Sequence, residues 1–300
     1  MNNPSRRWRS IAGAAAMSLL ATVLAACGGG IKVTSANEVV VPKQLSRIVS
    51  LSPTATESLF AIGAGRQVIA VDSLSTYPPV APVKNLSAFN LNIEAVAKYK
   101  PDLVVLSFDT TSAKNALDGF KKLNIPVLLQ PAAKDLAEVY AQIEELGAVT
   151  GHKDGASKVI KKMRADIAAA LKSANPGKGI KIFHEVDSTL YSATSDTFIG
   201  SVYKDFGLTN IADAAATADA KGYPQLTSEY VVKANPMVVF LADTSDGTSA
   251  DTVAIRPGWD EVQAVRMRSV VALDSDIASR WGPRVVELYK AVAKAIPALM

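Results

Sequence analysis

The feature that most constrains the fold of this chain is an alternation of short apolar runs with longer amphipathic segments. Apolar runs such as Val68–Val71 and Leu103–Leu106 are flanked by polar residues and have the length of buried strands. Several of the segments between these runs carry apolar residues at spacings of three and four, as amphipathic helices do. The alternation predicts an α/β protein.

The same pattern places the individual elements. The expected strands are Arg47–Leu51, Val68–Val71, Leu103–Leu106, Val127–Leu129, Lys181–Val186 and Leu190–Ala193. The expected helices are a first one opened by Ser52 and Pro53, then residues 93–99 capped by Asn92, Ala113–Leu123, Asp135–Val149, Asp154–Ser173 and Thr197–Phe206. Thr54 and Glu57 have the spacing of a capping box in the first helix, and Asp196 is expected to cap the last.

A faint internal repeat indicates two lobes. Residues 91–98 align with residues 226–233, and a proline and an apolar run follow both copies. Between the copies lies Asp154–Ser173, the longest expected helix, whose apolar residues recur every three or four positions. The many lysines of this helix are interpreted as a solvated helix face.

Composition narrows the class of protein. A chain of 300 residues has the length of about two domains, and 49% hydrophobic with 20% charged residues is typical of a globular protein. The formal net charge is +4, but Arg6, Arg7 and Arg9 lie in the first 26 residues, which hold no acid, so the remainder carries +1. This balance provides no concentrated basic face and argues against nucleic-acid binding.

Residues 1–26 are expected to form a lipoprotein signal peptide. Basic residues precede an apolar segment, Ile11–Ala26, that is too short to cross a bilayer as a helix. It ends in Leu24-Ala25-Ala26-Cys27, which resembles the bacterial lipobox, so Cys27 is expected to carry the lipid. The alternative is an ordinary secretory signal beside a chance cysteine. Cys27 is the only cysteine, which excludes a disulfide within the chain.

Four segments of the mature chain resemble one family of transport proteins. They are SRIVSLSPTATESLFAIGAGRQVIAVDSLSTYPP, NIEAVAKYKPDLVVLS, SDTFIGSVYKDFGLTNIAD and YPQLTSEYVVKANPMVVFLAD. They are similar to segments of the iron-siderophore and cobalamin periplasmic substrate-binding family and occur in that family's order. The resemblance implies an α/β fold with two Rossmann-like lobes joined by a single long rigid helix.

The resemblance also implies a domain organisation and a function. The chain would divide into the signal peptide (1–26), a flexible tether (27–44), an N-terminal lobe (45–152), a connecting helix (153–175) and a C-terminal lobe (176–300). It would be a monomeric binding protein without enzymatic activity, anchored at the outer face of the cytoplasmic membrane and working with the permease and ATPase of an ABC importer. The competing classes are a structural or signalling lipoprotein of the cell envelope on the same scaffold, and a hydrolase.

The family's ligand-binding positions fall on five residues here. Phe89, Tyr191 and Tyr223 match positions where cobalamin binders carry aromatic rings, which present rigid apolar area to a macrocycle. Asp276 and Arg280 match a carboxylate and an arginine that contact the ligand in the family. The alternatives are ordinary packing for each ring and, for the charged residues, an ion pair with each other across four positions.

Two glutamates match the family's docking positions. Glu94 and Glu229 correspond to glutamates, one from each lobe, that pair with arginines of the permease. The alternative is a pair of solvated acids favoured by the dipole at helix starts.

The expected ligand is a metal chelate: cobalamin or another corrinoid, a ferric siderophore, or haem. Ser107 stands where the cobalamin binder used for comparison has a tryptophan, so this position departs from the corrinoid pattern and a siderophore remains a close alternative. The two histidines, His152 and His184, fall in different lobes, which argues against a site for a bare metal ion. No resident cofactor is expected.

Overall fold

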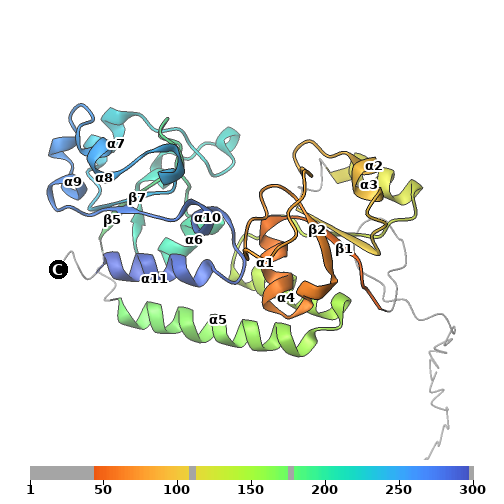
Figure 1. Cartoon of the computed structure of the whole chain (residues 1–300). Helices are drawn as coiled ribbons and strands as arrows, with labels where there is room; N and C mark the ends of the chain where they lie inside the picture. Colours follow the sequence, from red (N-terminus) through yellow and green to blue (C-terminus); the bar gives the residue numbers. More distant parts are fainter. Residues whose placement is uncertain (1–43, 108–112, 175–178, 297–300) are drawn as a thin grey trace, which may run out of the picture.

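The computed structural model describes residues 44–107, 113–174 and 179–296, and these form two lobes that lie side by side (Figure 1). Each lobe is built on a parallel sheet. In the N-terminal lobe the strand order is β2-β1-β3-β4, and in the C-terminal lobe it is β6-β5-β7-β8. The strands are β1 (Ile48–Leu51), β2 (Val68–Val71), β3 (Leu103–Leu106), β4 (Val127–Leu129), β5 (Lys181–Glu185), β6 (Thr209–Asn210), β7 (Val238–Leu241) and β8 (Val270–Ala272).

Helices cover both sheets and connect the lobes. The N-terminal lobe has α1 (Pro53–Ala61), α2 (Ile93–Ala97), α3 (Ala113–Lys122) and α4 (Leu136–Thr150). The C-terminal lobe has α6 (Phe198–Asp205), α7 (Ser228–Ala234), α8 (Ala250–Ala254), α9 (Gln263–Arg266), α10 (Ser275–Ser279) and α11 (Val285–Ala295). The helix α5 (Lys153–Ser173) runs beneath both lobes in Figure 1. The α/β fold with two lobes and one long joining helix is therefore confirmed. Within the described residues, no helix combines the length and apolarity needed to span a bilayer.

The internal repeat has a structural counterpart. Asn92 caps α2 by accepting a hydrogen bond from the backbone of Ala95 at 2.9 Å, and Thr227 caps α7 by accepting one from Tyr230 at 3.2 Å. Each helix leads into the third strand of its lobe, β3 or β7, which occupies the same place in the two strand orders. The aligned segments are therefore equivalent elements of two similar lobes.

Three local predictions were wrong. Ser52, not Thr54, caps α1, because Pro53 fills the first helical position, where a missing N–H costs nothing, and Ser52 accepts the bond from Ala55 at 3.2 Å. Thr197, not Asp196, caps α6 by accepting from the backbone of Gly200.

The segment Leu190–Ala193 is not a strand. Leu190 has a φ of +67°, which breaks the extended backbone, and only Tyr191 joins an isolated antiparallel bridge to Gln225.

The hydrophobic core continues from one lobe into the other. One cluster of buried apolar side chains includes residues of α1 and α4, of α5, and of α6 and α11, whereas two further clusters each stay within one lobe. The buried face of α5 consists of Ala156, Ile160, Met163, Ile167 and Ala170, five of the seven apolar positions predicted. A Cβ on Gly155 would lie 2.0 Å from the carbonyl oxygen of Ile62, so glycine permits close packing of α5 on the end of α1. The lobes therefore share one packed layer.

A buried ion pair crosses between the lobes. Arg284, at the start of α11, donates to Glu57 Oε1 on α1 from Nε at 2.9 Å and also from Nη2. The side chains are 20% and 2% exposed. The Arg284 guanidinium also lies 3.9 Å from the ring centre of Tyr77 in the N-terminal lobe. Burial raises the pKa of Glu57, and its hydrogen bond with Arg284 opposes that rise.

Arg284→Met is expected to lower the free energy of unfolding by about 3 kcal/mol, because it leaves the Glu57 carboxylate buried without its partner. The matched control is Lys290→Met, which removes an exposed pair with Glu287 and is expected to cost less than about 1 kcal/mol. Urea unfolding followed by circular dichroism measures both effects. Equal effects of the two substitutions would contradict the role assigned to the buried pair.

Candidate functional site

Polar side chains gather where strands of the N-terminal lobe end. Ser52 follows β1, Ser107 follows β3 and Gln130 follows β4. Together with Ser279 and Trp281 of the C-terminal lobe, they line a hollow of about 140 Å³. Ligands of open parallel sheets bind beyond the carboxyl ends of the strands. Sequence analysis singled out only Ser107 among these five residues, although the positions of Ser52 and Gln130 directly after predicted strands also carried a signal.

Two hydrogen-bond donors at this boundary have no partner among the described residues. They are Nη1 of Arg280 and Nε1 of Trp281, both shielded from solvent. The Trp281 ring stacks on Phe198 with ring centres 4.7 Å apart and planes at 22°, which holds the indole in place. A buried donor without an acceptor costs free energy, and such groups gather at functional sites. The two donors suit a ligand that presents carbonyl or carboxylate oxygens.

The predicted pair Asp276 and Arg280 is brought together by the structure. Arg280 Nη2 lies 2.6 Å from Asp276 Oδ1, so the two residues form an ion pair across four positions, and their contact with a ligand stays a prediction. The pair also lies close to the N-terminal lobe, since the charge of Arg280 lowers the pKa of Glu57 and of Asp72, which burial raises in both. The pairing leaves Nη1 of Arg280 available for a ligand.

The three predicted aromatic residues have different surroundings. Phe89 is 89% exposed and lies before α2, so core packing does not explain it. The segments of Tyr191 and Tyr223 run side by side: Tyr191 bridges to Gln225, and the Ser192 N–H donates to the carbonyl of Pro224 at 2.9 Å. Tyr191 is 40% exposed, whereas Tyr223 packs partly against the shared core, which raises its pKa. None of the three is among the residues that line the hollow. Their contact with a ligand remains a prediction.

Glu94 and Glu229 occupy equivalent places on the two lobes. Both are exposed and lie in the first turn of a short helix, α2 or α7, on the side of the molecule away from α5 (Figure 1). The pKa of Glu229 is lowered by its own backbone N–H and by the hydroxyl of Thr227, which keeps the carboxylate charged. Cys27 lies outside the described residues.

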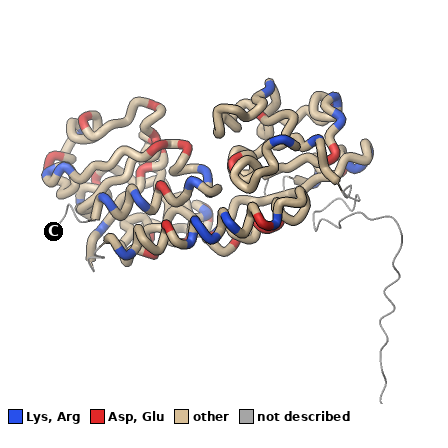
Figure 2. The backbone as a smooth tube through the Cα atoms, turned by 60° about the horizontal axis from the view of Figure 1, so that its bottom comes forward, with Lys and Arg blue, Asp and Glu red and all other residues tan. Residues whose placement is uncertain are grey.

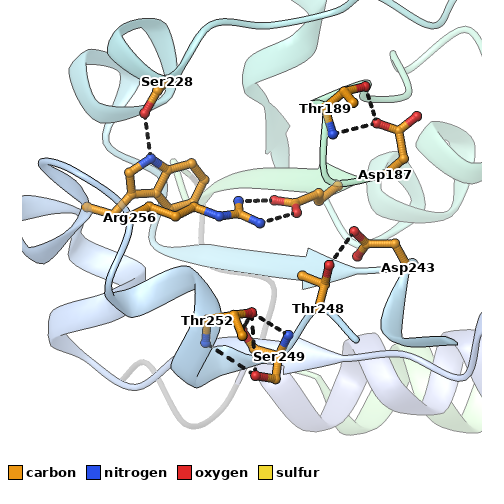
Figure 3. A network of polar contacts seen from close by, with 10 residues as sticks. Asp187, Thr189, Ser228, Asp243, Thr248, Ser249, Thr252 and Arg256 are labelled. Carbon is orange, nitrogen blue, oxygen red and sulfur yellow. Dashed lines mark hydrogen bonds and ion pairs between the residues drawn. The ribbon is translucent and has the colours of Figure 1, made fainter. Parts of the chain in front are cut away.

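A polar network in the C-terminal lobe supports the helix of Glu229 (Figure 3). Arg256 donates from Nη1 and Nη2 to the two oxygens of Glu185, each at 2.6 Å, and lies 4.8 Å from the ring centre of Trp259. Trp259 donates from Nε1 to Oγ of Ser228, the first residue of α7, at 2.8 Å. Sequence analysis did not find this network, because its members are up to 74 positions apart in the chain, from Glu185 to Trp259.

The histidines do not form a metal site. His184 is fully buried, its Nδ1 lies 2.7 Å from the hydroxyl of Tyr203, and burial lowers its pKa to about 4. His152 lies at the corner between α4 and α5. Among the described residues, no group of three or more His, Cys, Asp or Glu side chains is placed to hold a metal ion.

A larger hollow lies away from the predicted ligand residues. It measures about 490 Å³ and is lined by residues of α1, α5 and α11 and by the segment around Tyr77. None of the predicted site residues lines either hollow. Both hollows are lined from both lobes, and we place the candidate site at the smaller one because strands of the N-terminal lobe end there.

Phenylalanine substitutions distinguish the fully buried Trp259 from the partly buried Trp281. Trp259→Phe breaks the bond to Ser228 at a fully buried position and is expected to lower the free energy of unfolding by about 2–3 kcal/mol. Trp281→Phe removes a donor that has no partner to lose and is expected to cost less than about 1 kcal/mol. Urea unfolding of the two variants makes the comparison. An equally large loss at Trp281 would contradict its assignment as an unpaired donor.

Comparisons with known proteins agree with this architecture. A family model described as periplasmic binding protein matches residues 48–277. The ABC transporter substrate-binding lipoprotein YvrC of Bacillus subtilis is 33% identical, over 94% of this chain and 95% of that protein. A cobalamin-binding protein of Halobacterium salinarum is 29% identical, over 83% of this chain and 69% of that protein.

A solved structure gives the same result for the fold. A possible iron-binding (periplasmic solute-binding) protein from Staphylococcus epidermidis superimposes with a TM-score of 0.71 at 28% identity, over 85% of this chain and 99% of that one. Residues 48–277, which the family model matches, include both sheets and the connecting helix. The chain therefore belongs to the periplasmic binding protein family and is a substrate-binding protein of the ABC-transporter type.

Proposed function

We propose that this protein, anchored by a lipid at Cys27, captures a metal chelate outside the cytoplasmic membrane for import, and that a corrinoid is the first candidate ligand. The observation that carries the proposal is the hollow between the lobes, which Trp281 lines with its unpaired Nε1, together with the unpaired Nη1 of Arg280, the preceding residue. The protein acts by binding alone, as a monomer, and passes the chelate to a permease driven by its ATPase.

The chemistry of the site supports an amide- or carboxylate-bearing chelate. Corrinoids carry amide arms and ferric siderophores and haem carry carbonyl or carboxylate oxygens, all of which accept hydrogen bonds from Arg and Trp. The exposed rings of Phe89 and Tyr191 offer apolar contact to a flat or bulky ligand. The relatives support the corrinoid first, because the Halobacterium protein is named for cobalamin, and an iron chelate second, because the Staphylococcus protein is named for iron.

Calorimetric titration of the purified protein with cobalamin, cobinamide, a hydroxamate siderophore, a catecholate siderophore and haem tests the ligand. We expect one class to bind with a Kd of about 1 μM or tighter. Phe89→Ala and Trp281→Phe should each weaken that ligand about tenfold or more, because a ring or a donor at the contact is lost. Trp259→Phe is the matched control and should bind normally, since its N–H is bonded within the protein. No binding of any chelate would overturn the proposal.

We also propose that Glu94 and Glu229 dock the protein on its permease. Their equivalent positions on two similar lobes give two charges on one side of the molecule, where they can orient a partner with matching cations (Figure 1). The network from Glu185 to Ser228 then holds the docking helix α7 in place.

The double variant Glu94→Lys with Glu229→Lys is expected to abolish uptake of the ligand into cells while its Kd stays within twofold of the parent value, because like charges repel the permease surface. The matched control is Glu138→Lys with Glu287→Lys, which makes the same charge change at two exposed first-turn acids of α4 and α11. Loss of ligand binding in the first variant would place these glutamates in the ligand site instead. Normal uptake by the first variant would contradict docking.

A further inference from the structure

The connecting helix α5 carries a basic face that the transport function does not use. Its buried residues fall along one side, and at about 100° per residue Lys158, Lys161 and Lys172 fall along the opposite side. All three are exposed. Figure 2 shows Lys and Arg residues distributed along this helix. We call these three lysines the lysine face.

The lysine face is not neutralised within the protein. On the flanks of α5, Lys162 pairs with Asp166 at 2.5 Å, and Arg164 lies 4.2 Å from the ring centre of Tyr140. In the part of the chain that the structure describes, no ion pair joins Lys158, Lys161 or Lys172 to an acid. Asp154 lies on the same side, in the first turn of α5, where the helix dipole favours a negative charge.

The shape of this surface suits contact with a broad, flat partner. Between Lys161 and Lys172 the exposed positions on this side of the helix are Ala165, Ala168 and Ala169, whose short side chains leave the lysines protruding, while the exposed Lys162 and Arg164 lie on its flanks. The helix has 21 residues, so the lysine face extends over a length of roughly 20 Å. A planar array of phosphates can meet all three ammonium groups at once.

The described part of the chain begins beside the start of α5, within reach of the proposed lipid anchor. Gln67 donates from Nε2 to the carbonyl of Leu45 at 3.0 Å and to that of Thr150, at the end of α4, at 3.1 Å. The first described residues therefore lie beside the start of α5. Residues 27–43 separate Cys27 from this point, and a chain of that length spans at most roughly 60 Å.

We propose that the lysine face rests on anionic phospholipid when the protein is not docked on its permease, an inference that rests on the lipid anchor proposed above. Basic side chains are attracted to phospholipid headgroups within about a Debye length, and an anchor keeps the protein inside that range. α2 and α7, with Glu94 and Glu229, lie on the opposite side of the molecule from α5 (Figure 1). Membrane contact through α5 and docking through the glutamates therefore exclude each other, and the resting protein turns its docking side away from the membrane.

Lysine labelling of the mature lipoprotein on vesicles tests this orientation. A water-soluble acylating reagent is applied to protein on vesicles of phosphatidylcholine alone and of phosphatidylcholine with phosphatidylglycerol, and mass spectrometry gives the rate at each lysine. On the anionic vesicles at low salt, we expect labelling of Lys158, Lys161 and Lys172 to slow by about fivefold and to recover in about 0.5 M salt, where the Debye length is short. The internal controls Lys98 on α2 and Lys233 on α7 should label equally on both vesicles.

Three outcomes would overturn the inference. The lysine face could label at the same rate on both vesicles, or Lys98 and Lys233 could slow as much as the lysine face. Protection of the lysine face on neutral vesicles by soluble polyphosphate, without protection by phosphatidylglycerol, would assign the face to a polyanion other than lipid. Failure of the protein to remain on neutral vesicles at all would instead refute the lipid anchor, so the two proposals fail in different ways.

A pair of charge-matched variants adds a second readout. Lys158→Gln with Lys161→Gln removes two charges from the lysine face, and Lys98→Gln with Lys233→Gln removes two from the opposite side. The first variant should lose the salt-sensitive protection of Lys172 on anionic vesicles, and the second should keep it. Retained protection in the first variant would contradict the role of these lysines.

Discussion

Two features fix the relative position of the two lobes. They are the buried ion pair between Glu57 and Arg284 and the apolar layer beneath it. Arg284 reaches from the start of α11 to α1 of the other lobe, and one cluster of buried side chains runs through α1, α5 and α11 below it. Moving the lobes apart would expose an apolar layer and separate a largely buried pair of opposite charges. The candidate ligand site is therefore a largely preformed hollow, and the connecting helix is part of a shared core.

The site itself combines satisfied and unsatisfied polar groups. Asp276 holds one side of the Arg280 guanidinium and the Phe198 ring holds Trp281, yet each residue keeps one buried donor without an acceptor. Each such donor costs roughly 1–3 kcal/mol in the unliganded protein. A binding protein can tolerate this loss of free energy when the ligand supplies the missing acceptors. Part of the binding free energy then comes from pairing the two donors.

The two lobes have the same strand order but support α2 and α7, the helices that carry Glu94 and Glu229, in different ways. α2 begins at Asn92 on the surface, whereas α7 is also held from inside, by Trp259, Arg256 and the buried carboxylate of Glu185. Burial raises the pKa of Glu185, and the bidentate bond from Arg256 opposes it. Such a support fixes the direction of a seven-residue helix that would not be stable alone.

The sequence by itself determined the α/β class, the order of most elements, the repeated helices of Glu94 and Glu229, and the buried face of α5, because these depend on local periodicity and capping. The quoted motifs also determined the family. Only the tertiary structure decided that Glu57 faces Arg284 instead of capping its own helix, that Leu190–Ala193 is not a strand, and that Asp276 pairs with Arg280. It also showed which donors stay unpaired at the hollow. The physical reason is that these outcomes depend on tertiary contacts: Glu57 and Arg284 meet across 227 positions of chain, and the four-position spacing of Asp276 and Arg280 left both their ion pair and a ligand contact open.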